Sequence, residues 1–144
     1  MKQPEFIQRL DHPAIEAAIA QAERLTSGEI RVVVTLVAAA EPVPAAEKAF
    51  GELGMAGTKQ RNGVLFFVAP VSQTFAVIGD TAVHEKCGDA FWREVSAAMT
   101  ASFKCGEFTA GLLHGIGRAG ALLAEHFPPG PDDTDELPNR VVCP

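Results

Sequence analysis

The longest uninterrupted run of apolar residues predicts the central strand of a sheet. Residues 64–69 read Val-Leu-Phe-Phe-Val-Ala and offer no polar position that could face solvent. β-Branched and aromatic residues dominate the run, which favours a strand covered on both faces. Asn62-Gly63 before it provides a turn that accepts positive φ, and Pro70 after it lacks the N–H needed to continue the hydrogen-bonding pattern.

Two further segments predict strands that pair with this run. Residues 29–37 are rich in β-branched residues and follow a break at Ser27-Gly28. A short helical pattern at residues 45–53 connects them to the central run, and such a connection implies right-handed, parallel pairing. Residues 74–78 follow the run after only four residues, which allows only a hairpin. The sequence therefore predicts a mixed sheet.

Helical periodicity predicts most of the remaining elements. Apolar residues recur every three or four positions in residues 13–26, 89–104 and 108–127, and a shorter helix or turn is expected at residues 81–87. The last helix contains four glycines, at positions 111, 115, 117 and 120. Each costs roughly 1 kcal/mol relative to alanine, so we expect another backbone to pack closely against that face.

These elements predict an α/β fold, a three-layer α/β/α sandwich whose mixed sheet carries parallel strands, a hairpin and helices on both faces. The length of 144 residues fits one domain. We assign residues 1–12 to an N-terminal arm, residues 13–127 to the α/β domain, and residues 128–144 to a disordered, proline-rich, acidic tail.

Charge and composition exclude several classes of function. The net charge is −6 and the twelve lysines and arginines are scattered, so nucleic acid is not expected as a partner. No segment reaches the ~18 apolar residues of a membrane span, and the first ten residues lack the apolar core of a secretory signal. Three cysteines without a C-x-x-C spacing favour neither disulfides nor zinc, which predicts a reducing, cytoplasmic location.

One cysteine spacing matches a known catalytic pattern. Cys87 and Arg93 have the separation of phosphatases that use a thiolate nucleophile, but Phe91 and Trp92 occupy the intervening loop and belong to a helical stripe. We therefore favour a structural role for these residues, with Trp92 in the core. The four histidines form no H-x-x-x-H or H-x-H pair, so surface or capping roles are expected for them.

Carboxylates at the ends of elements are the better candidates for a site. Glu29 begins one predicted strand, Asp80 follows another, and Asp89 and Glu107 stand at helix starts. Oxygen ligands of this kind suit a hard divalent cation, whereas capping explains acidic residues at helix starts equally well. Because Glu29 opens a parallel strand and Asp80 ends the antiparallel one, both can lie at the same end of the sheet. Arg31, within an apolar strand, is expected at an edge with its stem packed.

Several short motifs resemble the TPM domain family, which is named for a thylakoid lumen protein, a photosystem II repair protein and a modulator of a levamisole receptor. The resemblance spans about residues 12–127. The motifs are Ser27-Gly28-Glu29-Ile30-Arg31-Val32, Arg61-Asn62-Gly63-Val64-Leu65, Ile78-Gly79-Asp80, Gly88-Asp89-Ala90-Phe91-Trp92 and residues 103–112, Phe-Lys-Cys-Gly-Glu-Phe-Thr-Ala-Gly-Leu.

The resemblance implies an α/β sandwich with helices on both faces. It also implies links to the upkeep of membrane protein complexes, to calcium binding and to a weak acid phosphatase activity. The chain departs from the family in lacking an export signal and membrane anchor, in having Arg61 where an acidic residue or glycine often stands, and in having Gly79-Asp80-Thr81 for a Gly-aromatic-Gly turn. It is similar to the short, soluble bacterial members.

Three functions follow as expectations. The first is a soluble binding or regulatory module with an unidentified protein partner and a calcium site formed by Glu29, Asp80 and Asp89. The alternative is a weak, metal-assisted acid phosphatase. The third is an interaction domain without a small ligand, which uses its acidic tail or the glycine-rich face of its last helix. Carboxylates that converge in a cleft favour the first two, and a flat apolar patch favours the third.

Overall fold

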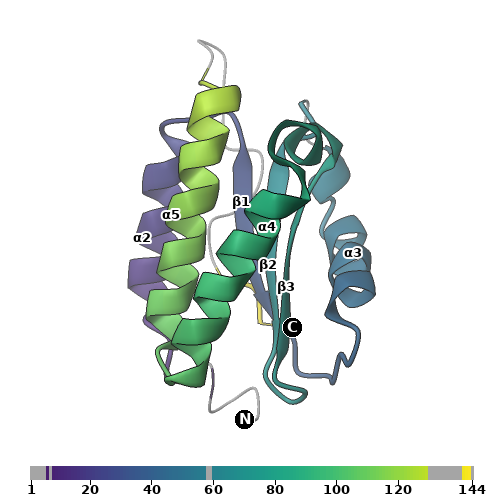
Figure 1. Cartoon of the computed structure of the whole chain (residues 1–144), viewed down its shortest axis with the longest axis vertical. Helices are drawn as coiled ribbons and strands as arrows, with labels where there is room; N and C mark the ends of the chain where they lie inside the picture. The colour runs from purple at the N-terminus through teal and green to yellow at the C-terminus, as the bar shows by residue number, and fades with distance from the viewer. Residues whose placement is uncertain (1–5, 7, 58–59, 130–140, 144) are drawn as a thin grey trace.

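The computed structural model describes residue 6 and residues 8–57, 60–129 and 141–143 (Figure 1). Its helices and strands follow the predicted order. They are α2 (His12–Glu23), β1 (Glu29–Val34), α3 (Pro42–Glu52), the short 3₁₀ helix η1 (Met55–Gly57), β2 (Gly63–Ala69), β3 (Thr74–Gly79), α4 (Thr81–Lys104) and α5 (Phe108–His126).

The described strands form one mixed sheet in the order β1-β2-β3. β1 runs parallel to β2, with Glu29 opposite Gly63, and β3 returns antiparallel to β2, with Gly79 opposite Val64. Every residue of β2 is buried. The predictions of a central apolar strand, one parallel pair and one hairpin are therefore confirmed, and the fold class is α/β.

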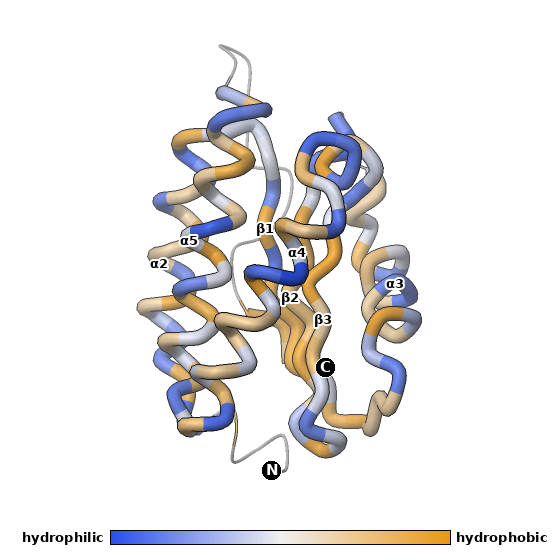
Figure 2. The backbone as a smooth tube through the Cα atoms, in the orientation of Figure 1, coloured by the Kyte–Doolittle hydropathy of each residue, from blue (hydrophilic) through white to orange (hydrophobic). Residues whose placement is uncertain are grey.

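Helices pack against both faces of this sheet because successive side chains of β2 point to opposite sides. Val64, Phe66 and Val68 share one core with α2, α4 and α5, whereas Leu65 and Phe67 share a second core with α3 and η1. Figure 1 shows α3 on one side of the sheet and the other three helices on the opposite side. In Figure 2 the strands form a hydrophobic band between helices that carry hydrophilic positions.

Several element boundaries differ from the predictions, and the largest differences are at α2, β1 and α3. α2 ends at Glu23 rather than at residue 26. β1 ends at Val34 rather than at residue 37, because its neighbour β2 ends at Ala69; Thr35 still donates its N–H to the carbonyl oxygen of Val68, at 2.9 Å. α3 begins at Pro42 rather than at residue 45, since proline is tolerated in the first helical turn, where its missing N–H has no intrahelical acceptor.

The helix α4 is broken at Gly88, which adopts a positive φ of 71°. Glycine reaches this conformation without the steric penalty that a Cβ atom brings. The break separates a short helical piece, which begins at Thr81, from the longer helix that ends at Lys104. The predicted short helix followed by a longer one is therefore correct.

Three of the four glycines of α5 face the core at close range. A Cβ atom would lie 2.7 Å from Phe103 at position 111, 2.6 Å from Phe66 at position 115 and 2.9 Å from Ala22 at position 120, whereas position 117 is open. The close packing was predicted, but the nearest neighbours are side chains rather than a backbone. Two phenylalanine rings and the methyl group of Ala22 pack this closely against α5 because glycine has no side chain.

Both predicted terminal segments have described residues that contact the domain. In the predicted arm, the ring of Phe6 is buried and lies 4.6 Å from that of Phe108. In the predicted tail, Val142 pairs with β1 through an isolated parallel bridge to Val33, which differs from the disorder expected for this residue. Residues 1–5, 7, 130–140 and 144 lie outside the described residues, so the remaining tail prediction stays untested.

Candidate functional site

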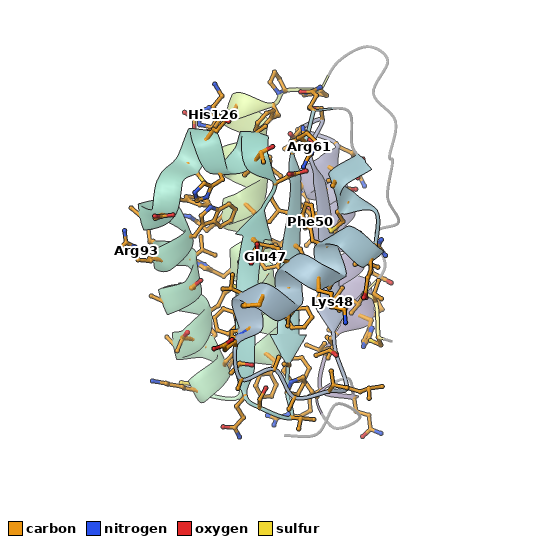
Figure 3. All side chains as sticks on the ribbon, turned by 90° about the vertical axis from the view of Figure 1, so that its right-hand side faces the viewer. Glu47, Lys48, Phe50, Arg61, Arg93 and His126 are labelled. Carbon is orange, nitrogen blue, oxygen red and sulfur yellow. The ribbon has the colours of Figure 1, made fainter. Side chains whose placement is uncertain are left out.

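A cleft of about 660 Å³ opens along the β3 side of the sheet, between α3 and the first turns of α4. Figure 3 shows Glu47 and Phe50 of α3 on the same side of the molecule as Arg61. The described residues that line the cleft are Val43, Glu47, Phe50, Ala56, Arg61, Val77, Ile78, Gly79, Asp80, Thr81, His84, Glu85 and Trp92.

The centre of the cleft is a two-pronged ion pair between Arg61 and Asp80. The Nε and Nη2 atoms of Arg61 donate to Oδ2 and Oδ1 of Asp80, at 2.8 and 3.0 Å. The Asp80 side chain is 4% exposed and that of Arg61 is 49% exposed. The hydrogen bond to Asp80, followed by its charge, raises the pKa of Arg61 above its ordinary value. The pair therefore neutralises a buried carboxylate with a half-exposed guanidinium.

Local backbone geometry fixes both partners of this pair. Arg61 has a positive φ of 52° and precedes Asn62, which is buried and donates to Ser27 Oγ at 3.1 Å. Asp80 caps α4, since its Oδ1 accepts from the N–H of Thr81 at 2.7 Å. The carbonyl oxygen of Arg61 accepts from the N–H of Ala82. The first two amides of α4 are therefore occupied and do not present donors to an anion.

The predicted metal-site residues are placed at three different positions. Glu29 is buried at the start of β1 and lies opposite Gly63, whose carbonyl oxygen accepts from the N–H of Asp80. Glu29 and Asp80 thus lie at the same end of the sheet, as predicted, but on opposite sides of β2. The side chain of Asp89 is 76% exposed and lies 3.5 Å from His84. Within the described residues, no group of three or more His, Cys, Asp or Glu side chains is arranged to hold a metal ion.

The described residues do not fit a calcium ion as they stand. Calcium takes six to eight oxygen ligands, and both oxygens of Asp80 already accept hydrogen bonds from Arg61. The guanidinium lies where a cation bound to this carboxylate would lie. Calcium at Glu29, Asp80 and Asp89 stays a prediction, and its binding requires Arg61 to leave Asp80.

Helix capping explains the position of Asp80 at the start of α4, whereas Glu107 makes no side-chain hydrogen bond to the start of α5.

Most residues that line the cleft, Arg61 among them, were not among the predicted site residues. Glu47 and Glu85 are exposed on α3 and α4, where acidic residues are common and carry no local signal of function. Trp92, predicted in the core, packs against the core beneath α2, α4 and α5 and also lines the cleft, with its ring 5.1 Å from that of Phe91. Among the described residues its buried Nε1 has no hydrogen-bond partner.

The structure does not give Cys87 the surroundings of a nucleophile. Burial, and secondarily the nearby charge of Asp89, raise the pKa of its thiol. A raised pKa means less thiolate at neutral pH, so alkylation by iodoacetamide at pH 7.5 is expected to be about tenfold slower at Cys87 than at the exposed Cys105. Peptide mass mapping over time measures both rates. Faster labelling of Cys87 would restore the thiolate interpretation, and equal rates in urea provide the control.

The architecture and the cleft define a class: a small α/β domain whose candidate site lies at the β3 edge of a three-stranded mixed sheet, between α3 on one face and α4 on the other. A family model described as TPM domain matches residues 1–122. The chain belongs to the TPM domain family.

Solved structures of two other proteins are among those that resemble this chain. The BA42 protein from the psychrophilic bacterium Bizionia argentinensis is 41% identical, with a TM-score of 0.84 and coverage of 92% of each chain. The N-terminal domain of a protein from P. gingivalis is 16% identical, with a TM-score of 0.58 over 77% of this chain and 72% of that one, and shows the fold alone. No curated protein matches. Among the described helices, none combines the length and apolar character needed to cross a bilayer.

Proposed function

We propose that this TPM domain acts as a binding or regulatory module for a protein partner, whose basic side chain enters the cleft between α3 and α4. The observation that supports this proposal is the charge of the lining. Glu47, Asp80 and Glu85 line the cleft together with one guanidinium, that of Arg61, so these four side chains carry a formal net charge of −2. Since Arg61 already neutralises Asp80, the carboxylates of Glu47 and Glu85 are left to attract a cation.

The apolar part of the lining suits the stem of a lysine or arginine. Phe50 and Trp92 contribute aromatic rings to the cleft, together with Val77 and Ile78 of β3. A long basic side chain can lay its methylene groups on such a surface while its charged end reaches the carboxylates. An indole ring also attracts a cation placed over its face.

A fluorescence titration tests this proposal because Trp92, which lines the cleft, is the only tryptophan in the chain. N-acetyl-lysinamide and N-acetyl-argininamide are expected to change its emission saturably in the millimolar range, and N-acetylglutamate is not. Glu47→Gln and Glu85→Gln should each weaken binding about threefold, as expected for one exposed ion pair.

Glu52→Gln is the matched control, since Glu52 lies on the same helix but pairs with Lys48 and does not line the cleft. It should leave the affinity unchanged. If all three variants bind the cationic amides as the wild type does, or if the emission never saturates, the cleft is not the binding site.

Calcium is a second occupant that we propose for this end of the sheet, under one condition. Calcium must displace Arg61 from Asp80. The two hydrogen bonds between the guanidinium and the carboxylate are then lost, and coordination of the metal by Asp80 replaces them. We therefore expect calcium to bind weakly to the wild type. Arg61→Ala removes the competing guanidinium and should bind calcium more tightly if Asp80 supplies a ligand, which calorimetry with calcium chloride measures.

The metal-assisted phosphatase is the less favoured proposal. A phosphate group in the cleft would meet three carboxylates and one guanidinium, and the N–H groups of Thr81 and Ala82 already have acceptors. Hydrolysis of p-nitrophenyl phosphate in the presence of calcium or magnesium, abolished by Asp80→Asn, would favour the phosphatase over the binding module.

The proposed location is the cytoplasm. This proposal rests on Cys87, Cys105 and Cys143, all of which are free thiols.

A further inference from the structure

A side-chain carboxylate and a short backbone segment cover different parts of the outer edge of β1. At the start of the strand, the N–H of Ile30 donates to the buried side chain of Glu23 at 2.8 Å. Towards its end, the N–H of Val34 donates to the carbonyl oxygen of Val142 at 2.9 Å, and the N–H of Val142 donates to Val32 at 2.8 Å. A carboxylate thus caps one part of the edge and an added strand pairs with the other.

The added segment has the side-chain pattern of a true strand. Val142 pairs in parallel with Val33. Val141 packs against the core beneath α2, α4 and α5, and Val142 packs against the core beneath α3. The edge of β1 therefore accepts an extended segment with two adjacent β-branched residues, one for each face of the sheet.

Exposed apolar residues continue directly beyond the part of the edge that this segment pairs with. Leu36 and Val37 follow β1 and are 55% and 58% exposed. Their side chains stay open to solvent while residues 141–143 are in place. β1 ends at Val34 and the chain bends at Leu36 and Val37, where the N–H of Val37 donates to Oγ1 of Thr35. An extended segment that continued beyond Val34 would therefore gain by covering these two side chains rather than by further backbone pairing.

We propose that the edge of β1 from Val32 to Val34, together with the exposed Leu36 and Val37 that follow it, is a strand-addition site for an extended apolar segment of a protein partner, and that residues 141–143 are an internal ligand which the partner displaces. The described part of the internal ligand is short, since one bridge joins it to β1, so a longer partner segment can compete with it. A partner that also covers Leu36 and Val37 buries more apolar surface. This site is separate from the cleft along β3 and does not depend on the function proposed for that cleft.

Val142→Pro in the full chain tests displacement, because proline removes the N–H that donates to Val32 and weakens the internal ligand. The probe is a fluorescein-labelled heptapeptide, Asn-Arg-Val-Val-Ser-Val-Val, followed by fluorescence anisotropy. We expect it to bind the variant about tenfold more tightly than the wild type, since the competing tethered segment is released. The same peptide with proline in place of each valine should not bind.

A matched pair of surface variants locates the probe. Leu36→Asp should weaken binding, whereas Leu25→Asp should not, because Leu25 is also exposed but precedes β1, at the opposite end of the strand from Leu36. Hydrogen exchange at the Val34 amide should be faster in Val142→Pro and slow again when the peptide is added. If Val142→Pro does not fold, Val142→Gly replaces it, with the same order of affinities expected at a smaller difference.

Three outcomes would overturn the proposal. The first is equal affinity of the peptide for wild type and variant, and the second is equal loss with Leu36→Asp and Leu25→Asp. The third is a concentration-dependent dimer of the wild type that Val142→Pro abolishes, because the occupant of the edge would then be a second copy of this chain rather than a different protein.

Discussion

Replacing Gly115 by alanine is expected to lower the free energy of unfolding by about 2 kcal/mol, although alanine is the better helix former. The new Cβ atom would lie 2.6 Å from Cε1 of Phe66 and 2.9 Å from Sδ of Met99. Phe66 is fully buried in the central strand, so its ring can move only by disturbing the core. Overpacking of this kind outweighs the gain of about 1 kcal/mol in helix propensity.

Gly117→Ala provides the control for this prediction. A Cβ atom at position 117 meets nothing within 4 Å. The substitution therefore changes only the helix propensity, and the free energy of unfolding should rise by about 1 kcal/mol. Urea unfolding followed by circular dichroism measures both variants. Equal effects of the same sign would contradict the packing assigned to α5.

Replacing Asp80 by alanine is expected to lower the free energy of unfolding by about 2.5 kcal/mol. The substitution removes the helix cap, in which Asp80 accepts from the N–H of Thr81, and this cap contributes about 1 kcal/mol. It also removes the hydrogen bonds from the charged guanidinium of Arg61, which contribute about 1.5 kcal/mol or more to a buried acceptor. Asp80→Asn retains an oxygen that can accept from Thr81, so its loss should be about half as large.

Asp89→Ala is the comparison for Asp80→Ala, because Asp89 belongs to the same helix and its side chain is 76% exposed. Its effect should stay within about 0.5 kcal/mol. Equal losses in both variants, measured by thermal and urea unfolding, would show that the buried pair with Arg61 does not stabilise the start of α4.

Most of the fold was predictable because apolar periodicity reports which residues are buried. The run from Val64 to Ala69 identified the central strand, and the four-residue link after it required a hairpin. The end of β1 was not predictable from β-branched residues alone, since it depends on where the neighbouring strand ends. The pairing of Val142 with β1 was missed because one short segment gives no signal of which edge it will meet.

The site was predictable in part. The strand order placed Glu29 and Asp80 at one end of the sheet, which the structure bears out. The hairpin register, with Val64 opposite Gly79, also places Asp80 beside the turn that contains Arg61. Glu47 reaches the cleft only through the packing of α3 on the sheet, which residue types in sequence do not specify.

The central claim is that Arg61, rather than a metal ion, neutralises Asp80 at the centre of the cleft. The side-chain Nε–H signal of Arg61 in a nitrogen–proton correlation spectrum tests it directly, because that proton is donated to Asp80. The account predicts a protected signal that stays unchanged when calcium chloride is added to about 5 mM, a concentration at which only weak sites remain empty. Loss of this signal together with shifts of the Asp80 and Thr81 amides would contradict the claim and would identify Asp80 as a calcium ligand.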